Sequence, residues 1–99
     1  MDYIDELRDA IRNLHGCEAE HIGFESVKEV FKGQTVWEGE VEVFNIRGHP
    51  TAKRCYAWAH ETDKGKRYVA VLELPPVDSA QSAVKAAIIQ EARDAKQKG

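Results

Sequence analysis

Three segments of alternating side chains between residues 36 and 74 constrain the fold of this chain more than any other feature. They read VWEGEVEVFNI, KRCYAWAHET and KRYVAVLEL, and only short turn-forming stretches separate them. Alternation with a period of two is typical of half-buried β-strands, and short connections favour antiparallel neighbours. The sequence therefore predicts an antiparallel sheet of three main strands over residues 36–74. Residues 24–31, which precede a predicted turn at Lys32-Gly33, could form a fourth strand, and the sequence leaves this possibility open.

Helical periodicity flanks this sheet on both sides. Before it, Ile4, Leu7, Ile11 and Leu14 follow the three-and-four spacing of a helix over residues 2–15, which Asp2 would cap and Gly16 would end. After Pro75-Pro76, an alanine-rich segment predicts a second helix over residues 78–95 that starts at Asp78 or Ser79. We expect an α+β two-layer sandwich, in the order helix, three or four strands, helix, with both helices on one face.

The size and charge of the chain limit the classes of function. Its 99 residues are enough for one domain, 1–99, and its net charge of −3 argues against a general attraction to nucleic acid. No apolar run is long enough to cross a bilayer, so we expect a soluble protein without a membrane partner. Two cysteines without a disulfide framework indicate the reducing cytoplasm.

The faces of the strands decide which side chains are available for binding. On the first strand, Val41 and Val43 are expected to face the core and Glu38, Glu40 and Glu42 the solvent. On the second strand, Tyr56, Trp58 and His60 share one face, and Cys55, Ala57 and Ala59 the other. We favour burial of Tyr56 and Trp58 against the helices, which would leave the small residues as an outer surface. The alternative is an exposed aromatic surface that binds a small ligand or forms part of the active site of an enzyme.

No group of residues in this sequence matches a catalytic or metal-binding motif closely. His15, Cys17 and His21 lie close together with two carboxylates, but their spacing matches no known zinc site, and we predict no metal and no cofactor. Cys55 and His60 differ by an odd number on one strand, so they cannot pair as nucleophile and base. The alternating glutamates are typical of a solvated strand face. We predict no catalytic residues.

The best candidate for contact with an anion is the loop RGHPTAKR, over residues 47–54. It concentrates four residues that carry or can carry positive charge: Arg47, His49, Lys53 and Arg54. Together with the element order and the helix sequence SAQSAVKAAI, this loop resembles the double-stranded-RNA-binding domain. The resemblance implies that the loop enters a minor groove and that lysines at the start of the last helix hold phosphates. Here that start reads PPVDSAQS, without those lysines.

These observations favour a small non-catalytic interaction module. A sheet of this kind leaves an edge open, and self-association into a homodimer is one use of such a surface. Nucleic-acid binding through the 47–54 loop, and ligand binding or catalysis on the aromatic face, stay open as alternatives.

Overall fold

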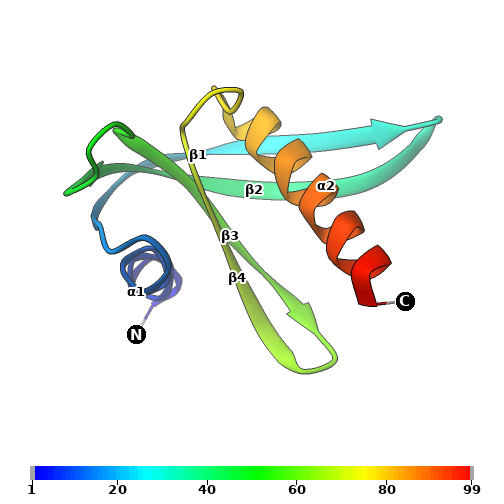
Figure 1. Ribbon diagram of the computed structural model, residues 1–99, viewed down its shortest axis with the longest axis horizontal. Helices are drawn as coiled ribbons and strands as arrows, with labels where there is room; N and C mark the ends of the chain where they lie inside the picture. Colours follow the sequence, from blue (N-terminus) through cyan, green and yellow to red (C-terminus); the bar gives the residue numbers. More distant parts are fainter. Residues whose placement is uncertain (1, 99) are drawn as a thin grey trace.

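A computed structural model describes residues 2–98 of the chain, with side chains for residues 2–94. Its elements are α1 (Tyr3–His15), β1 (Glu18–Phe31), β2 (Gln34–Arg47), β3 (Arg54–Thr62), β4 (Gly65–Leu72) and α2 (Ala80–Lys98). The strands form one antiparallel sheet in the order β1-β2-β3-β4 (Figure 1). The α+β class and the element order are confirmed, and the fourth strand that the sequence left open exists and begins at Glu18.

Local sequence signals explain where the helices begin and end. The Asp2 carboxylate accepts a hydrogen bond from the Asp5 amide at 2.9 Å, and Gly16 ends α1 with φ 68°. At the start of α2, Ser79 and Ser82 exchange hydrogen bonds between side chain and backbone amide, which satisfies two amides of the first turn. The predicted caps of both helices are therefore confirmed. None of the helices between residues 2 and 98 is both long and apolar enough to span a bilayer.

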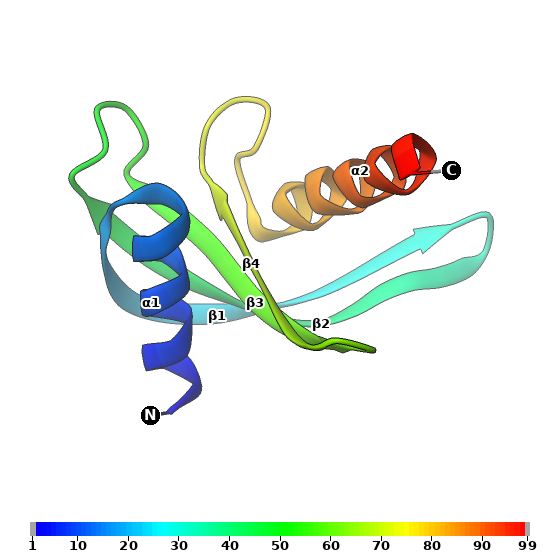
Figure 2. The same ribbon diagram turned by 60° about the horizontal axis from the view of Figure 1, so that its bottom comes forward.

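The two helices lie on opposite faces of the sheet, which corrects the predicted two-layer arrangement. Tyr56 and Trp58 pack in a core cluster with residues of α2, whereas Cys55 and Ala57 pack with residues of α1. Because successive strand residues point to opposite faces, the two clusters lie on opposite sides of β3. Figure 2 shows α1 and α2 on either side of the β3–β4 hairpin. The centre of the molecule thus has three layers.

Burial on both faces marks the middle of the sheet. Residues 41–44 of β2 and 55–58 of β3 are all buried, including Val41, Phe44 and Ala57 with no exposed surface. Runs of buried residues without alternation are typical of strands covered on both faces. The expectation that Cys55, Ala57 and Ala59 form an outer surface is therefore wrong, because α1 covers them.

The sheet divides beyond its centre. β2 and β3 are paired only between residues 42–45 and 54–57, whereas β1–β2 and β3–β4 are paired over much longer stretches. As a result the β1–β2 hairpin and the β3–β4 hairpin diverge, and α2 lies over the sheet between them (Figure 1). We call the gap between the diverging parts of β2 and β3 the fork.

Candidate functional site

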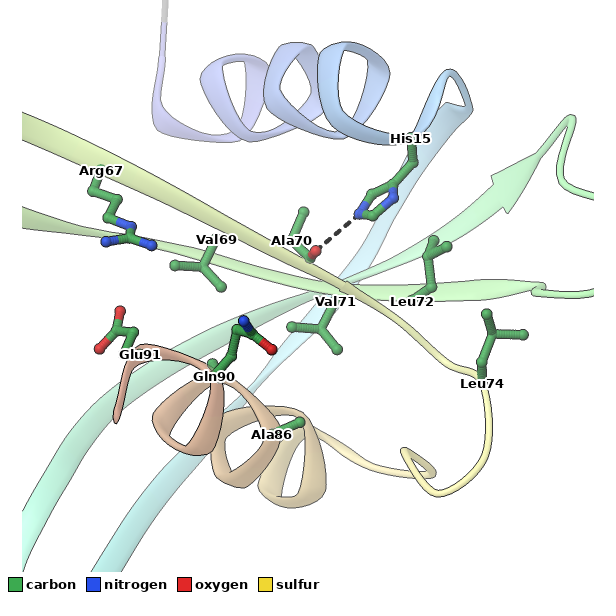
Figure 3. Close-up of a pocket in the computed structure, with 11 residues that line it drawn as sticks. His15, Arg67, Val69, Ala70, Val71, Leu72, Leu74, Ala86, Gln90 and Glu91 are labelled. Atoms are coloured by element: carbon green, nitrogen blue, oxygen red, sulfur yellow. Dashed lines mark hydrogen bonds between the residues drawn. The ribbon is translucent and has the colours of Figure 1, made fainter. Parts of the chain in front are cut away.

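A groove runs along the outer edge of β4, between the two helices (Figure 3). β4 is the last strand of the sheet, so one of its edges has no neighbouring strand. The groove has a volume of about 440 Å³. It is lined by residues from α1, β4, the segment after β4, and α2: His15, Arg67, Val69, Ala70, Val71, Leu72, Leu74, Ala86, Ala87, Gln90 and Glu91. We call it the β4-edge groove.

The main chain of β4 offers hydrogen-bonding groups to this groove. The Glu73 amide donates to the Arg54 carbonyl at 2.9 Å, which fixes the odd-numbered residues as those bonded to β3. The N–H and C=O groups of Tyr68, Ala70 and Leu72 therefore point toward the open edge. In agreement, His15 at the end of α1 donates from Nε2 to the Ala70 carbonyl at 2.9 Å.

The side chains of the edge are apolar at its centre and charged at its ends. Val69 and Val71 are half-buried on the α2 side, and Ala70 and Leu72 are half-buried on the α1 side. Arg67 lies before this apolar stretch and Glu73 follows it. The Leu72 carbonyl accepts a hydrogen bond from the Leu74 amide at 2.9 Å, but no strand among residues 2–98 pairs with this edge. The edge thus combines backbone groups without a strand partner and apolar surface, which are the two requirements for pairing with another strand.

Charged and phenolic groups anchor both ends of β4. Tyr68 donates its hydroxyl hydrogen to Glu6 at 2.5 Å, and the Lys66 ammonium lies 3.1 Å from the same Glu6 oxygen. These two hydrogen bonds lower the pKa of Glu6. At the other end the Tyr56 hydroxyl donates to Glu73. Burial, together with that hydrogen bond, raises the pKa of Tyr56 to about 12.

The predicted anion site lies at one end of the sheet and is organised by its histidine. The Nδ1 atom of His49 accepts hydrogen bonds from the amides of Thr51 and Ala52 at 3.1 and 2.8 Å, so this ring stabilises the loop itself. Arg47, Lys53 and Arg54 are exposed around it. The Arg54 carbonyl accepts a hydrogen bond from the Glu73 amide, so the loop adjoins the end of β4.

The alternative of an exposed aromatic surface on Tyr56, Trp58 and His60 is not realised. Tyr56 and Trp58 are only 2% and 3% exposed, because α2 covers them, and burial of these two residues is confirmed. His60 is half-buried and lies 3.7 Å from Glu91 of α2. Of the three residues, only His60 keeps an appreciable part of its surface in contact with solvent.

The residues considered for zinc or thiol chemistry point in different directions. His15 contacts β4, whereas the Nε2 atom of His21 lies 2.7 Å from a Glu42 oxygen. Among the described residues, no three side chains of metal-ligating type come together. Burial, with a smaller contribution from Cys17, raises the pKa of Cys55 to about 12, which keeps that thiol protonated.

Comparisons with known proteins identify no relative of this chain. No family model, no curated protein and no solved structure matches it. The assignment of function therefore depends on the geometry of the molecule alone.

Sequence reasoning missed two features of this geometry. Glu42 was expected in solvent, yet it is 7% exposed: it pairs with His21 of β1 and lies on the side of the sheet that faces α1. The β4-edge groove was missed as well. The signal for it was the unbroken apolar run from Val69 to Leu72, which indicates a strand covered on both faces even though it lies at an edge.

Proposed function

We propose that this chain is a small non-catalytic interaction module that forms a homodimer by pairing the β4 edges of two copies. The observation that carries the proposal is the open edge of β4, held between two helices and lined by apolar side chains. Strand addition uses such an edge, because the added strand satisfies the exposed main-chain groups. Two copies paired in this way would form one continuous sheet of eight strands, since each copy contributes four.

The sequence of β4 is complementary to itself in one antiparallel register. If the two-fold axis passes through Ala70, then Val69 lies opposite Val71 of the second copy, and Tyr68 lies opposite Leu72. In the same register Arg67 lies opposite Glu73, and the symmetry produces this pair of opposite charges twice. Opposite charges and apolar side chains directly across a ladder stabilise the pairing of strands. This complementarity favours a second copy over an unrelated strand as the occupant.

The main chain of β4 fits the same register. Ala70, Tyr68 and Leu72 are the residues whose N–H and C=O groups point outward, and this register makes Ala70 pair with Ala70 and Tyr68 with Leu72. The Ala70 carbonyl already accepts a hydrogen bond from His15, and its second lone pair stays free for the partner strand. The Ala70 carbonyl, at the centre of the proposed interface, can therefore accept a hydrogen bond from His15 and a second one from the partner strand.

Charge reversal tests this register directly. Opposite-charge pairs across a ladder contribute ~0.2–1 kcal/mol each, so replacing two attractive pairs by repulsive ones weakens the dimer by about 2 kcal/mol, or roughly 30-fold in Kd. We expect Arg67→Glu alone and Glu73→Lys alone to favour monomers in analytical ultracentrifugation. A mixture of the two variants restores both attractive pairs, because each copy then supplies the charge that the other needs. Lys28→Glu, on the exposed surface of β1, is the matched control and leaves the dimer unchanged.

Two outcomes would refute the proposal. One is a wild-type chain that stays monomeric at millimolar concentration. The other is a mixture of Arg67→Glu and Glu73→Lys that associates no better than either variant alone, which would place the interface elsewhere. Circular dichroism of each variant checks that the loss of the Glu73 contact with Tyr56 has not unfolded the protein.

The cysteines support a place for this module in the reducing cytoplasm. Cys17 and Cys55 are free and buried, on the side of the sheet that α1 covers. Burial without a disulfide suits a compartment in which thiols stay reduced.

A further inference from the structure

The fork between β2 and β3 contains a second cavity, separate from the β4-edge groove. It has a volume of about 320 Å³. Its lining comes from the start of α1 and from the diverging parts of the two strands: Tyr3, Trp37, Glu38, Gly39, Glu40, Glu42, Trp58, Ala59 and His60. None of these residues lines the β4-edge groove, so the two cavities are independent.

In the fork, the hydroxyl group of Tyr3 takes the place of a hydrogen-bond partner from β2. Where β2 has diverged, the Ala59 amide donates instead to the hydroxyl oxygen of Tyr3 at 2.9 Å. Trp37 and Trp58 meet across the fork edge to face, with ring centroids 5.6 Å apart and an angle of 69° between the planes. A Cβ atom on Gly39 would lie 3.2 Å from the Trp37 ring, so glycine lets this indole lie flat against the strand. The cavity thus has three aromatic residues in its walls.

The polar part of the cavity is negative. Glu42 is 7% exposed, and its Oε1 atom pairs with His21. Its other oxygen has no hydrogen-bond partner among residues 2–94, and because no fully buried side-chain oxygen in that part of the chain is left unpaired, this oxygen is in contact with solvent. Glu38 and Glu40 continue the row along the same face of β2, and neither takes part in an ion pair among residues 2–94. A buried carboxylate with a free oxygen favours a cationic hydrogen-bond donor.

A cation already lies near one wall of the cavity. The Lys66 ammonium lies 5.8 Å from the centre of the Tyr3 ring, but its hydrogen bond to Glu6 holds it. It is therefore not available to Glu38 and Glu40 of the carboxylate row, and among the described residues Glu42 has only His21 as a partner. Burial raises the pKa of Tyr3, with a smaller contribution from the negative charge of Glu42, so the hydroxyl stays neutral beside that carboxylate.

We propose that the fork binds an organic cation, an alkylammonium or alkylguanidinium group, between its aromatic residues and its carboxylates. The charged head would donate to the free oxygen of Glu42, and the alkyl chain would contact the half-buried face of Trp37. Aromatic rings combined with carboxylates are the usual means by which proteins hold such groups. The group is carried by a free amine or by a Lys or Arg side chain of a peptide, and the two sources share this chemistry.

The experiment titrates the intact chain with n-butylammonium, n-butylguanidinium and the neutral n-butanol. Two-dimensional NMR of the indole N–H groups reports on Trp37 and Trp58 separately. We expect saturable shifts at Trp37 with one of the two cations and none with n-butanol. Nα-acetyl-lysine amide, compared with n-butylammonium, distinguishes a peptide side chain from a free amine, because tighter binding of the former indicates contacts with the peptide backbone.

Two substitutions test the role of the carboxylates. Glu42→Gln removes the buried charge and keeps the shape, and we expect affinity for the cation to fall at least about tenfold. Glu40→Gln, at an exposed position, is a second variant that preserves the His21 contact, and we expect a smaller loss. Glu25→Gln, exposed on β1 and outside the cavity, is the control and leaves binding unchanged. Equal binding of n-butanol, absence of any shift at 50 mM cation, or unchanged affinity in both variants would each overturn the proposal.

Discussion

The placement of α1 and α2 on opposite faces of the sheet makes a sharp prediction about Ala57. This residue has no exposed surface and packs with Leu7, Ile11 and Phe44 beneath α1. Were both helices on the face of Tyr56 and Trp58, Ala57 would lie on an open surface instead. The substitution Ala57→Leu is therefore expected to destabilise the protein strongly in the first arrangement and hardly at all in the second.

The expected size of the effect follows from the packing. Leucine adds three carbon atoms where the surrounding side chains leave no room, and overpacking of this kind destabilises a core by ~1–3 kcal/mol. In a domain of this size each kcal/mol corresponds to roughly 4–8 °C in Tm, so we expect a fall of about 4–24 °C. At an exposed position the same leucine would change the free energy of unfolding by less than ~0.5 kcal/mol.

The assay is urea unfolding followed by tryptophan fluorescence, with the free energy extrapolated linearly to water. Ser26→Leu is the matched control, because Ser26 is a small residue in an exposed position on β1. All variants are compared at one protein concentration, since the proposed dimer would make apparent stability depend on concentration. If Ala57→Leu and Ser26→Leu agree within ~0.5 kcal/mol, the three-layer arrangement is refuted.

Two further predictions concern the α2 side of the sheet. Tyr56→Phe removes the hydrogen bond to Glu73 and is expected to lower the free energy of unfolding by ~1–3 kcal/mol at neutral pH. Because the pKa of Tyr56 in the folded protein is about 12, above its ordinary value of 10.0, the stabilisation by this hydroxyl is complete below pH 10 and is lost as the pH rises through 12. The difference in free energy of unfolding between wild type and Tyr56→Phe should therefore shrink between pH 10 and pH 12. A difference that stays constant over this range would contradict the stabilising role of the Tyr56 hydroxyl. In Trp37→Phe, the remaining Trp58 should resist quenching by acrylamide until urea unfolds the chain, since it is 3% exposed, whereas quenching as strong as that of free indole would place Trp58 at the surface.

The elements of this fold were predictable because they depend on local interactions. Asp2 and Gly16 determine the ends of α1, and Lys32-Gly33 forms the predicted turn with positive φ angles of 53° and 77°. Alternation placed Val41 and Val43 in the core, which the structure confirms. Each of these features needs only residues a few positions apart in the chain.

The candidate sites were harder to predict, because they depend on how distant elements meet. Glu42 alternates with Glu38 and Glu40, and nothing in that pattern distinguishes it, yet it pairs with His21 of a neighbouring strand and is 7% exposed. The β4-edge groove requires two helices from opposite ends of the chain to flank one strand. The fork requires β2 and β3 to separate after a short ladder.

By itself, the sequence determined the order and type of the two helices and of three strands, and it favoured the burial of Tyr56 and Trp58; it left the fourth strand open. The prediction that both helices cover one face was wrong, because β3 is apolar on both faces: Tyr56 and Trp58 on one, Cys55, Ala57 and Ala59 on the other. Only the tertiary structure decided which face each helix covers, by packing the alanines of α2 against the large rings and the large side chains of α1 against the small residues. Complementary volumes on the two sides of one strand are the physical reason that the helices lie apart.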